Sequence, residues 1–421
     1  MVAAALAKAR RRLLPFLFLL YVVSYLDRIN VGFAALQMNA ALGFSSVTYS
    51  FGAGIFFLSY TLLEIPSNVI LARVGARLWI ARIMITWGLI SAGMMFVHSA
   101  TAFYVLRFAL GAAEAGFFPG IIYCLTKWFP RRERARAIAG FMTAVVVAGI
   151  VGGPISGALL SLDGVGGLAG WQWLFVVEGL PAVVLGVVVL RVLPGQPSEA
   201  RWLTPEEQLA LTTTLLAEEA SPESTVHSIR SALTSGRVWL LATVYFTIPV
   251  MLYAFGFWLP QIVRSASGAG DFAIGWLSAI PYAVAAVGMV VIGRHSDRTG
   301  ERRWHIALTA MIGGAAFALT GFVHGTAFVM TTLSIAMLGL ASMLGPFWAF
   351  ATSFLGGIGA AAGIALVNSV GNVGGFVGPN IIGYVQQATG GFTGGLVAIG
   401  AVLAAGGLLV LAVNTPKKPL V

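Results

Sequence analysis

Long apolar segments alternate with short polar ones along nearly the whole chain. Each apolar segment runs for roughly 20 residues, which is long enough for a helix to cross a hydrocarbon layer about 30 Å thick. The longest polar interruption, at residues 194–236, is rich in Pro, Glu, Ser and Thr and separates the segments into two sets. We place twelve segments, at residues 13–35, 50–71, 78–97, 101–124, 137–160, 172–192, 238–262, 272–293, 305–323, 327–350, 360–386 and 392–413.

This pattern predicts an all-α integral membrane protein with twelve transmembrane helices in two pseudo-symmetric halves. The expected parts are a six-helix bundle at residues 1–193, a cytoplasmic linker at 194–236 and a second six-helix bundle at 237–421. Composition supports this class, because 58% of the residues are hydrophobic and only 10% are charged. Such a chain has too few polar residues to cover a soluble surface.

The basic residues indicate an orientation in the membrane. A formal net charge of +10 is also found in nucleic-acid-binding proteins, but those gather their basic residues on one soluble face, whereas here they lie between apolar segments. All but three of the 25 Lys and Arg residues fall on one side of the twelve-helix arrangement, the exceptions being Arg28, Arg107 and Arg264. Because positively charged loops stay in the cytoplasm, both termini are predicted to be cytoplasmic. No nucleic acid partner is expected.

An internal repeat links the two halves. The loop after the second segment and the loop after the eighth share an Arg-x-Gly-x-Arg pattern, so that Arg73 corresponds to Arg298, 225 residues later. The fifth and eleventh segments share a Gly-x-x-x-Gly-Pro pattern at 149–154 and 374–379, with the same offset. Two separate matches at one offset indicate a duplicated six-helix unit. Two facing halves with a site near the middle of the membrane are typical of secondary transporters.

Four charged residues stand out among those inside the predicted spans: Asp27, Arg28, Arg107 and Glu114. Each such charge costs about 2.5–3.5 kcal/mol at the centre of a membrane helix, so it normally faces protein or water and has a partner. Asp27 and Arg28 are separated by about 100° around their helix and cannot point the same way. Arg107 and Glu114 are seven residues apart and share a face, about 10.5 Å apart along the axis. The sequence leaves open which member of the first pair faces a central cavity.

An arginine beside a buried carboxyl is suited to proton coupling. Burial raises the proton affinity of a carboxyl and a neighbouring arginine lowers it, so a substrate that engages the arginine favours protonation of the carboxyl. The guanidinium also offers two parallel hydrogen bonds to a substrate carboxylate. A purely structural interpretation also stays open, in which Arg28 only neutralises Glu114 or Asp27 and holds two helices together. Two other acidic residues, Glu64 and Glu178, are expected to pair with loop arginines near helix ends.

Several motifs together resemble a known transporter family. The loop sequence GRHSDRTGER at 293–302 resembles the major facilitator superfamily. Within it, the chain resembles the anion:cation symporter family over nearly its whole length, and most closely the bacterial tartrate and aromatic-acid carriers. The first copy of the loop departs from the family pattern, with Ala72 in place of the usual aspartate and Asn68 in place of a glycine. The motifs that carry the resemblance are SYLDRINVGFA, YTLLEIPSN, GAAEAGFFPG, KWFPRRERARA and NSVGNVGGFVGP.

The resemblance assigns roles to particular residues. It implies that Glu114 couples protons, with Asp27 as a second protonatable carboxyl, and that Arg28 and Arg107 hold the substrate anion. The hydroxyls of Tyr25 and Tyr60 are expected to reach the substrate, although interface tyrosines with satisfied hydroxyls are the alternative. From the second half, Trp348 is a candidate for the cavity wall, and Asn368 and Asn372 share a face of the eleventh span. The expected gating-loop residues are Asp297, Arg298 and Arg73.

These observations predict a proton symporter for uptake of a small organic acid anion by alternating access. The resemblance favours tartrate, while the abundant aromatic residues also suit aromatic acids. Anion exchange without proton coupling is the alternative. A membrane enzyme or receptor is disfavoured, since the sequence has no metal-ligand cluster, phosphate-binding glycine loop or sizeable soluble domain. The proton is the only coupling ion expected, with no cofactor. The protein is expected to be a monomer in the bacterial inner membrane.

Overall fold

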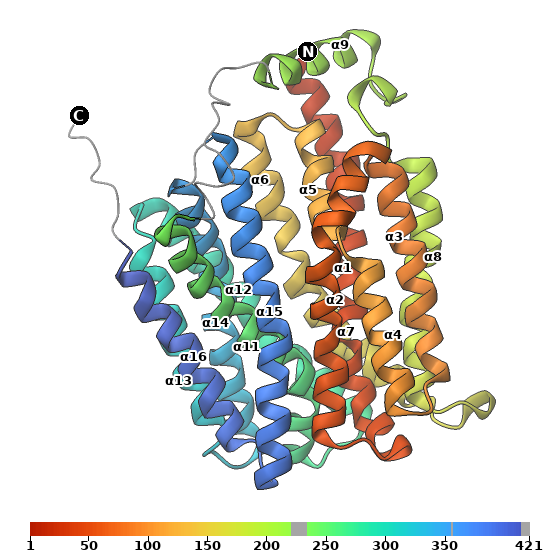
Figure 1. Cartoon of the computed structure of the whole chain (residues 1–421), viewed down its shortest axis with the longest axis vertical. Coiled ribbons are helices and arrows are strands. Elements are labelled where there is room, and N and C mark those ends of the chain that lie inside the picture. The colour runs from red at the N-terminus through yellow and green to blue at the C-terminus, as the bar shows by residue number, and fades with distance from the viewer. Residues whose placement is uncertain (220–233, 355–356, 414–421) are drawn as a thin grey trace. The chain divides into compact units, whose positions relative to one another are not determined.

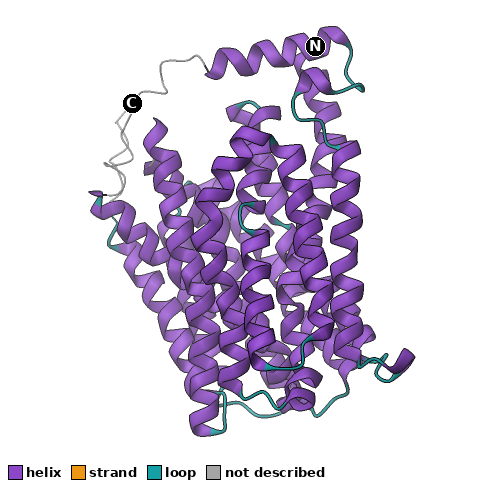
Figure 2. Cartoon of the chain, turned by 45° about the vertical axis from the view of Figure 1, so that its right-hand side comes forward, coloured by secondary structure: helices purple, strands orange, loops and turns teal. Residues whose placement is uncertain are grey.

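The computed structural model describes residues 1–219, 234–354 and 357–413, and its regular secondary structure there is helical throughout (Figures 1 and 2). Three short 3-10 helices, η1 to η3, lie at Met94–Phe96, Val165–Gly167 and Pro197–Glu199. The α-helices are α1 Val2–Leu42, α2 Ser46–Val74, α3 Ala76–Gly93, α4 Ala100–Glu114, α5 Phe117–Trp128, α6 Arg131–Met142, α7 Ala144–Leu160, α8 Gly170–Val192, α9 Pro205–Glu219, α11 Gly236–Ser267, α12 Asp271–Thr299, α13 Arg303–Thr320, α14 Thr326–Phe354, α15 Gly357–Thr389 and α16 Thr393–Leu411.

Ten helical segments within the described residues are long and apolar enough to cross a membrane. They match ten of the twelve predicted spans. The remaining two predicted spans, at 305–323 and 360–386, correspond to α13 and α15, which are helical but are not among those ten. The all-helical membrane architecture is therefore confirmed, while the count of twelve and the cytoplasmic termini stay predictions.

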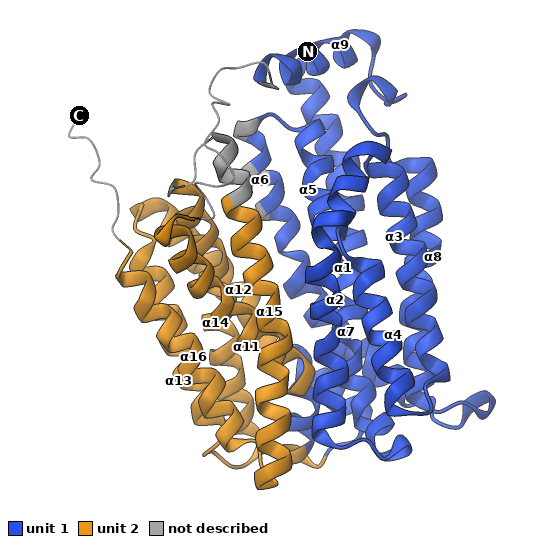
Figure 3. Cartoon of the chain, in the orientation of Figure 1, with its two compact units in different colours: residues 1–224, 259–264, 269–279 blue, residues 225–258, 265–268, 280–421 orange. Residues whose placement is uncertain are grey.

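The chain divides into two compact units (Figure 3). The first consists of residues 1–224, 259–264 and 269–279, and the second of 225–258, 265–268 and 280–421. The predicted division at 1–193, 194–236 and 237–421 stays a prediction.

Two short stretches from α11 and α12 belong to the first unit because polar contacts tie them to α1. Arg264, on the last turn of α11 rather than in the expected loop, donates to the Leu36 carbonyl at 2.8 Å and pairs with Asp271. Asp271 also accepts a hydrogen bond from Gln37 at 2.7 Å. One glutamine, one arginine and one aspartate thus connect the ends of three helices.

Small residues allow the helices of each unit to approach closely. In the first unit α3 and α8 lie side by side (Figure 1), and a Cβ atom added at Gly88 would lie 2.8 Å from the Gly179 carbonyl oxygen. In the second unit α13 and α16 meet at Gly314 and Gly400, where an added Cβ atom would overlap the partner's carbonyl oxygen. Close backbone approach through small residues is the usual way in which membrane helices gain contact area, since lipid provides no hydrophobic driving force between helices.

The linker contains an ordered helix, α9, that is attached to the start of α1. Its first turn has a capping box, in which the Thr204 amide donates to the Glu207 carboxylate at 3.0 Å and the Glu207 amide donates to the Thr204 hydroxyl at 3.3 Å. The same carboxylate accepts a hydrogen bond from the Lys8 ammonium at 2.8 Å. Hydrogen bonds from Lys8 and Thr204 lower the pKa of Glu207 below its ordinary value.

We expect Gly88→Ala to lower the stability of the protein by about 1–3 kcal/mol, because the added methyl group meets the backbone of α8. The measurement is equilibrium unfolding in mixed detergent micelles. Gly93→Ala is the matched control on α3, since a Cβ atom there meets nothing within 4 Å. Equal stability of the two variants would contradict the close packing of α3 on α8.

We expect α9 to loosen as the pH falls through the carboxyl range. Glu207 has a lowered pKa in the folded protein, so its contribution is present above the ordinary glutamate pKa and is lost as the pH falls through the lowered value. Hydrogen exchange of the amides of residues 205–219, corrected for intrinsic exchange rates, measures this. Lys8→Gln should cause a similar loss of protection at neutral pH, whereas Lys8→Arg should not. Unchanged protection in Lys8→Gln would show that the ion pair does not hold α9.

Candidate functional site

The predicted fourth span is interrupted directly after one of its charged residues. The sequence predicts a continuous helix over 101–124, but α4 ends at Glu114 and α5 begins at Phe117. Between them Ala115 is extended, and Gly116 has a φ of 88°, which a residue with a side chain rarely adopts. The predicted span is confirmed, since Ala100–Trp128 is long and apolar enough to cross a membrane, but two helices make it up rather than one. Because of the interruption, Glu114 is the last residue of α4.

A serine of α2 stabilises this interruption. The Ser67 hydroxyl donates to the Ala115 carbonyl at 2.6 Å and accepts a hydrogen bond from the Trp79 indole at 2.9 Å. A Cβ atom added at Gly116 would overlap the Ser67 hydroxyl. Backbone groups freed inside a membrane need such partners, because no water is available in hydrocarbon.

Arg28 and Glu114 form a buried ion pair between α1 and α4. Their side chains are only 7% and 1% exposed, respectively. The Ser24 hydroxyl, one helical turn before Arg28, donates to the same carboxylate oxygen at 2.8 Å. The Glu114 carboxylate therefore contacts both a cation and a hydroxyl.

Two aromatic rings of α2 lie beside the guanidinium of Arg28. Its central carbon is 5.4 Å from the ring centre of Phe56 and 5.4 Å from that of Tyr60. These rings are four residues apart and stack on each other with centres 5.9 Å apart. A cation over aromatic faces is stabilised by their negative potential. Sequence reasoning included Tyr60 but missed Phe56, which no local feature distinguishes from the other aromatic residues of the span.

Arg107 binds backbone carbonyl groups of α2. It is fully buried, and its guanidinium donates to the carbonyls of Ala53 at 2.9 Å and Gly52 at 3.4 Å. Its central carbon lies 5.1 Å from the centre of the Phe56 ring, so both arginines lie near the same ring. The close approach of α2 and α4 at Gly111, where a Cβ atom would overlap the Phe56 carbonyl, brings these groups together.

Asp27 points to a different helix from Arg28, as the 100° separation predicts. Its carboxylate accepts hydrogen bonds from the Ser91 hydroxyl of α3 and from the Asn30 amide, the latter at 3.2 Å. The side chain is buried. Tyr25 is also buried on α1, two residues before Asp27. The first unit thus brings together the predicted residues of α1, α2 and α4.

The predicted residues of the second unit lie on α14 and α15. Trp348 is half-buried and its ring contacts Tyr245 and Phe347, with centres 4.8 Å and 5.5 Å apart. Asn368 and Asn372 are half-buried one helical turn apart on α15. Tyr245, on α11, was missed by sequence reasoning and carried no charge or motif to reveal it.

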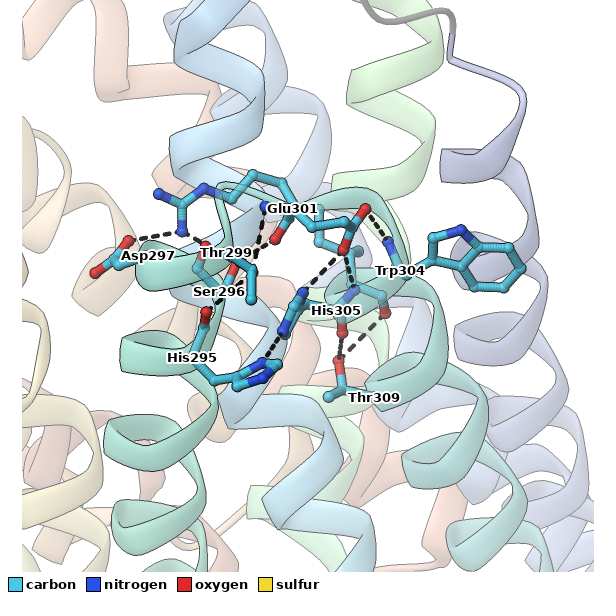
Figure 4. Close-up of polar contacts among 10 residues, drawn as sticks. His295, Ser296, Asp297, Thr299, Glu301, Trp304, His305 and Thr309 are labelled. Carbon is cyan, nitrogen blue, oxygen red and sulfur yellow. Dashed lines mark hydrogen bonds and ion pairs between the residues drawn. The ribbon is translucent and has the colours of Figure 1, made fainter.

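The loop between α12 and α13 contains a polar cluster (Figure 4). Asp297, in the last turn of α12, pairs at 2.6 Å with Arg302, which directly precedes α13. His305 bonds to the Glu301 carboxylate at 2.9 Å and to His295 at 2.7 Å. The other two predicted gating residues, Arg298 and Arg73, are exposed at the ends of α12 and α2. Within the described residues, no group of three or more His, Cys, Asp or Glu side chains is arranged to hold a metal ion.

Comparison with known proteins identifies the fold and its relatives. Residues 17–379 match the family described as the Major Facilitator Superfamily. An Agrobacterium vitis protein named "Putative tartrate transporter" is 48% identical over 417 residues, covering 99% of this chain and 93% of that protein. A Pseudomonas putida protein named "Putative metabolite transport protein NicT" is 46% identical over 389 residues, covering 92% and 89%.

The fold is also similar to a solved structure. A bacterial homologue of the human lysosomal transporter Spinster, in an inward-facing and occupied conformation, superposes with a TM-score of 0.77. The match covers 96% of both chains at 17% sequence identity, so it shows a common fold.

We expect Arg28→Gln to destabilise the protein by about 3–5 kcal/mol, because it leaves the Glu114 carboxylate buried without its cation. The double variant Arg28→Gln/Glu114→Gln should recover a large part of this loss, since it removes both charges. Equilibrium unfolding of the two single variants and the double variant measures the coupling between the residues. Additive effects would show that the ion pair does not contribute to stability.

Proposed function

Because the chain belongs to the Major Facilitator Superfamily, we propose that it is a proton-coupled symporter for uptake of a small organic acid anion. The family and the relatives identify the protein as a multi-pass membrane transporter of small molecules and not an enzyme. The observation that carries the proposal is the buried pair of Arg28 and Glu114, in which a cation suited to bind an anion is paired with a protonatable carboxylate.

Competition for Arg28 couples the substrate to the proton. In the structure Arg28 and Ser24 stabilise the ionised form of Glu114. When a substrate carboxylate takes the guanidinium, Glu114 loses its cation while remaining buried, and protonation becomes favourable. Binding of the anion and binding of the proton then assist each other, which is the requirement for symport.

The second arginine completes an anion site. Arg107 now donates to two backbone carbonyls of α2, and a substrate carboxylate is a stronger acceptor for the same donors. Tyr60, beside Arg28, and Tyr25 supply hydroxyls in the first unit. Trp348, Asn368 and Asn372 are proposed as neutral contacts from the second unit, and Asp27 as a second proton-binding carboxyl.

Alternating access would expose this site to each side of the membrane in turn. Protons bind from the outer side, the anion follows, and the two halves rock in the manner of a rocker switch. Release into a more alkaline cytoplasm restores the pair of Arg28 and Glu114. Asp297, Arg298 and Arg73 are proposed to control the cytoplasmic opening.

Tartrate is the substrate that we propose. Two arginines suit a dicarboxylate, since each guanidinium binds one carboxylate through two hydrogen bonds. The name of the Agrobacterium vitis relative, which covers nearly the whole chain, supports the same substrate. One carboxylate of tartrate would replace Glu114 at Arg28, and the other would replace the carbonyls of α2 at Arg107.

Anion exchange without proton coupling is the alternative. It is favoured by one observation, that Glu114 is already neutralised by Arg28 and needs no proton to be stable in the membrane. In that case the carboxylate would be structural, and an imposed pH gradient would leave uptake into proteoliposomes unchanged.

We expect Glu114→Gln to abolish tartrate accumulation driven by a pH gradient, while exchange of internal for external tartrate stays measurable. The glutamine cannot lose a proton, so it cannot release one to the cytoplasm. Uptake and counterflow in proteoliposomes measure the two activities separately. Glu206→Gln, an exposed substitution of the same kind on α9, is the control and should accumulate tartrate normally. A Glu114→Gln protein that still concentrates tartrate would refute the coupling role.

A further inference from the structure

One buried carboxyl of the first unit, Glu178, has no part in the cycle described above. We infer that Glu178 and Asp27 form a second proton-holding pair, organised by Asn30 and separate from the pair of Arg28 and Glu114. The inference rests on the proposed symport, because it assigns a transported proton to this second pair.

Glu178 lies inside the bundle and not at its edge. It is the ninth residue of α8, roughly 12 Å along the axis from Gly170 at the start of the helix. The side chain is buried and its carboxylate accepts a hydrogen bond from the Ser156 hydroxyl of α7 at 2.7 Å. The expectation that Glu178 pairs with a loop arginine was therefore wrong, because its carboxylate is bound by the Ser156 hydroxyl and no ion pair of Glu178 is found within the described residues. Glu64, which carried the same expectation, is likewise buried on α2.

The polar contacts of Glu178 and Asp27 differ in kind from those of Glu114. Each of the two carboxyls has one oxygen that is buried with no hydrogen-bond partner among the described residues, Oε2 of Glu178 and Oδ2 of Asp27. Their recorded donors are neutral, two hydroxyls and one amide. An unpaired carboxylate in such a place costs several kcal/mol, so the neutral acid is favoured. The oxygen without a hydrogen-bond donor is the one that would carry the proton in the neutral acid.

Asn30 connects the two carboxyls. It is buried on α1, its amide nitrogen donates to Asp27 at 3.2 Å, and the same side chain interacts with Glu178. Its own carbonyl oxygen is buried with no partner among the described residues. Asparagine has both a donor and an acceptor, so it can donate to a carboxylate and accept from a carboxylic acid. It therefore tolerates either protonation state of its neighbours.

The charges of the two carboxyls also act on each other. Two carboxylates in one buried network are less favourable than one carboxylate and one neutral acid, because like charges at close range oppose each other. The other charged groups that act on Asp27 are Glu114 and Arg107 of α4, while α3 and α7 contribute the hydroxyls of Ser91 and Ser156. Movement of Arg107 toward a substrate would change the field at Asp27. When one of the two carboxylates takes up a proton from water, it becomes a carboxylic acid, and no other bond changes.

Infrared difference spectroscopy on the full-length protein in liposomes tests the protonation of Glu178 without any transport. We expect the wild type at neutral pH to show buried protonated carboxyl bands, and Glu178→Gln to lose one of them. Glu206→Gln, the exposed control, should keep them all. An unchanged set of bands in Glu178→Gln would overturn the inference.

Transport measurements test whether this proton moves with substrate. The number of protons carried per tartrate, obtained from the pH gradient that balances a known tartrate gradient, should fall by one in Glu178→Gln. A wild type whose tartrate flux ignores the pH gradient would overturn the proposed function. A wild type with proton coupling and a Glu178→Gln variant with the same stoichiometry would overturn the role of Glu178 alone.

A second variant keeps the test decisive if Glu178→Gln does not fold. Ser156→Ala leaves the carboxyl in place but removes the hydroxyl that stabilises its charged form. The loss of one hydrogen bond should move the pH of half-maximal uptake upward by roughly 0.5–1 pH unit and shift the Glu178 infrared band. An unchanged pH profile together with an unshifted band would contradict the inference.

Discussion

The buried ion pair of Arg28 and Glu114 is the interaction on which the rest of the first unit depends. Neither charge is stable alone in a membrane span, so α1 and α4 must bring them together. The aromatic rings of α2 then enclose the guanidinium, and α4 ends at Glu114 rather than continuing. The interruption of the fourth span is compatible with the membrane because Ser67 satisfies the backbone that it exposes. One electrostatic requirement therefore accounts for the positions of three helices and one irregular turn.

The helical repeat divides the polar residues of α1 between two neighbourhoods. Arg28 faces α2 and α4, where a cation and aromatic rings suit an anion, while Asp27 faces α3 and shares Asn30 with Glu178 of α8. Residues that are adjacent in sequence thus serve different chemistry. In a symporter this separation is useful, because substrate and proton can occupy different places and still influence each other through the same helix.

Features that depend on residues close together in the sequence could be predicted, whereas those that depend on contacts between distant helices could not. The apolar segments depend on local composition, and each of the twelve predicted segments is largely helical, although the fourth is interrupted at Gly116 and the fifth is divided between α6 and α7. The four membrane charges were evident because charge is rare in such segments. Phe56 and Tyr245 were missed. An aromatic residue in an apolar span has no local feature that shows whether its ring lines a site or only packs against other helices. The capping box of α9 was present in the sequence as Thr-Pro-Glu-Glu, but its long polar surroundings were read only as a linker.

By itself the sequence determined the class of the protein, the helical segments, the family resemblance and the charged residues that a membrane tolerates only with partners. These properties depend on residue type and on spacings of a few positions. The tertiary structure alone decided the partners: Glu114 for Arg28, backbone carbonyls for Arg107, Ser91 for Asp27 and Ser156 for Glu178. The reason is geometric, because these partners lie as far as 86 residues apart in sequence, and only the packing of their helices selects which polar groups meet.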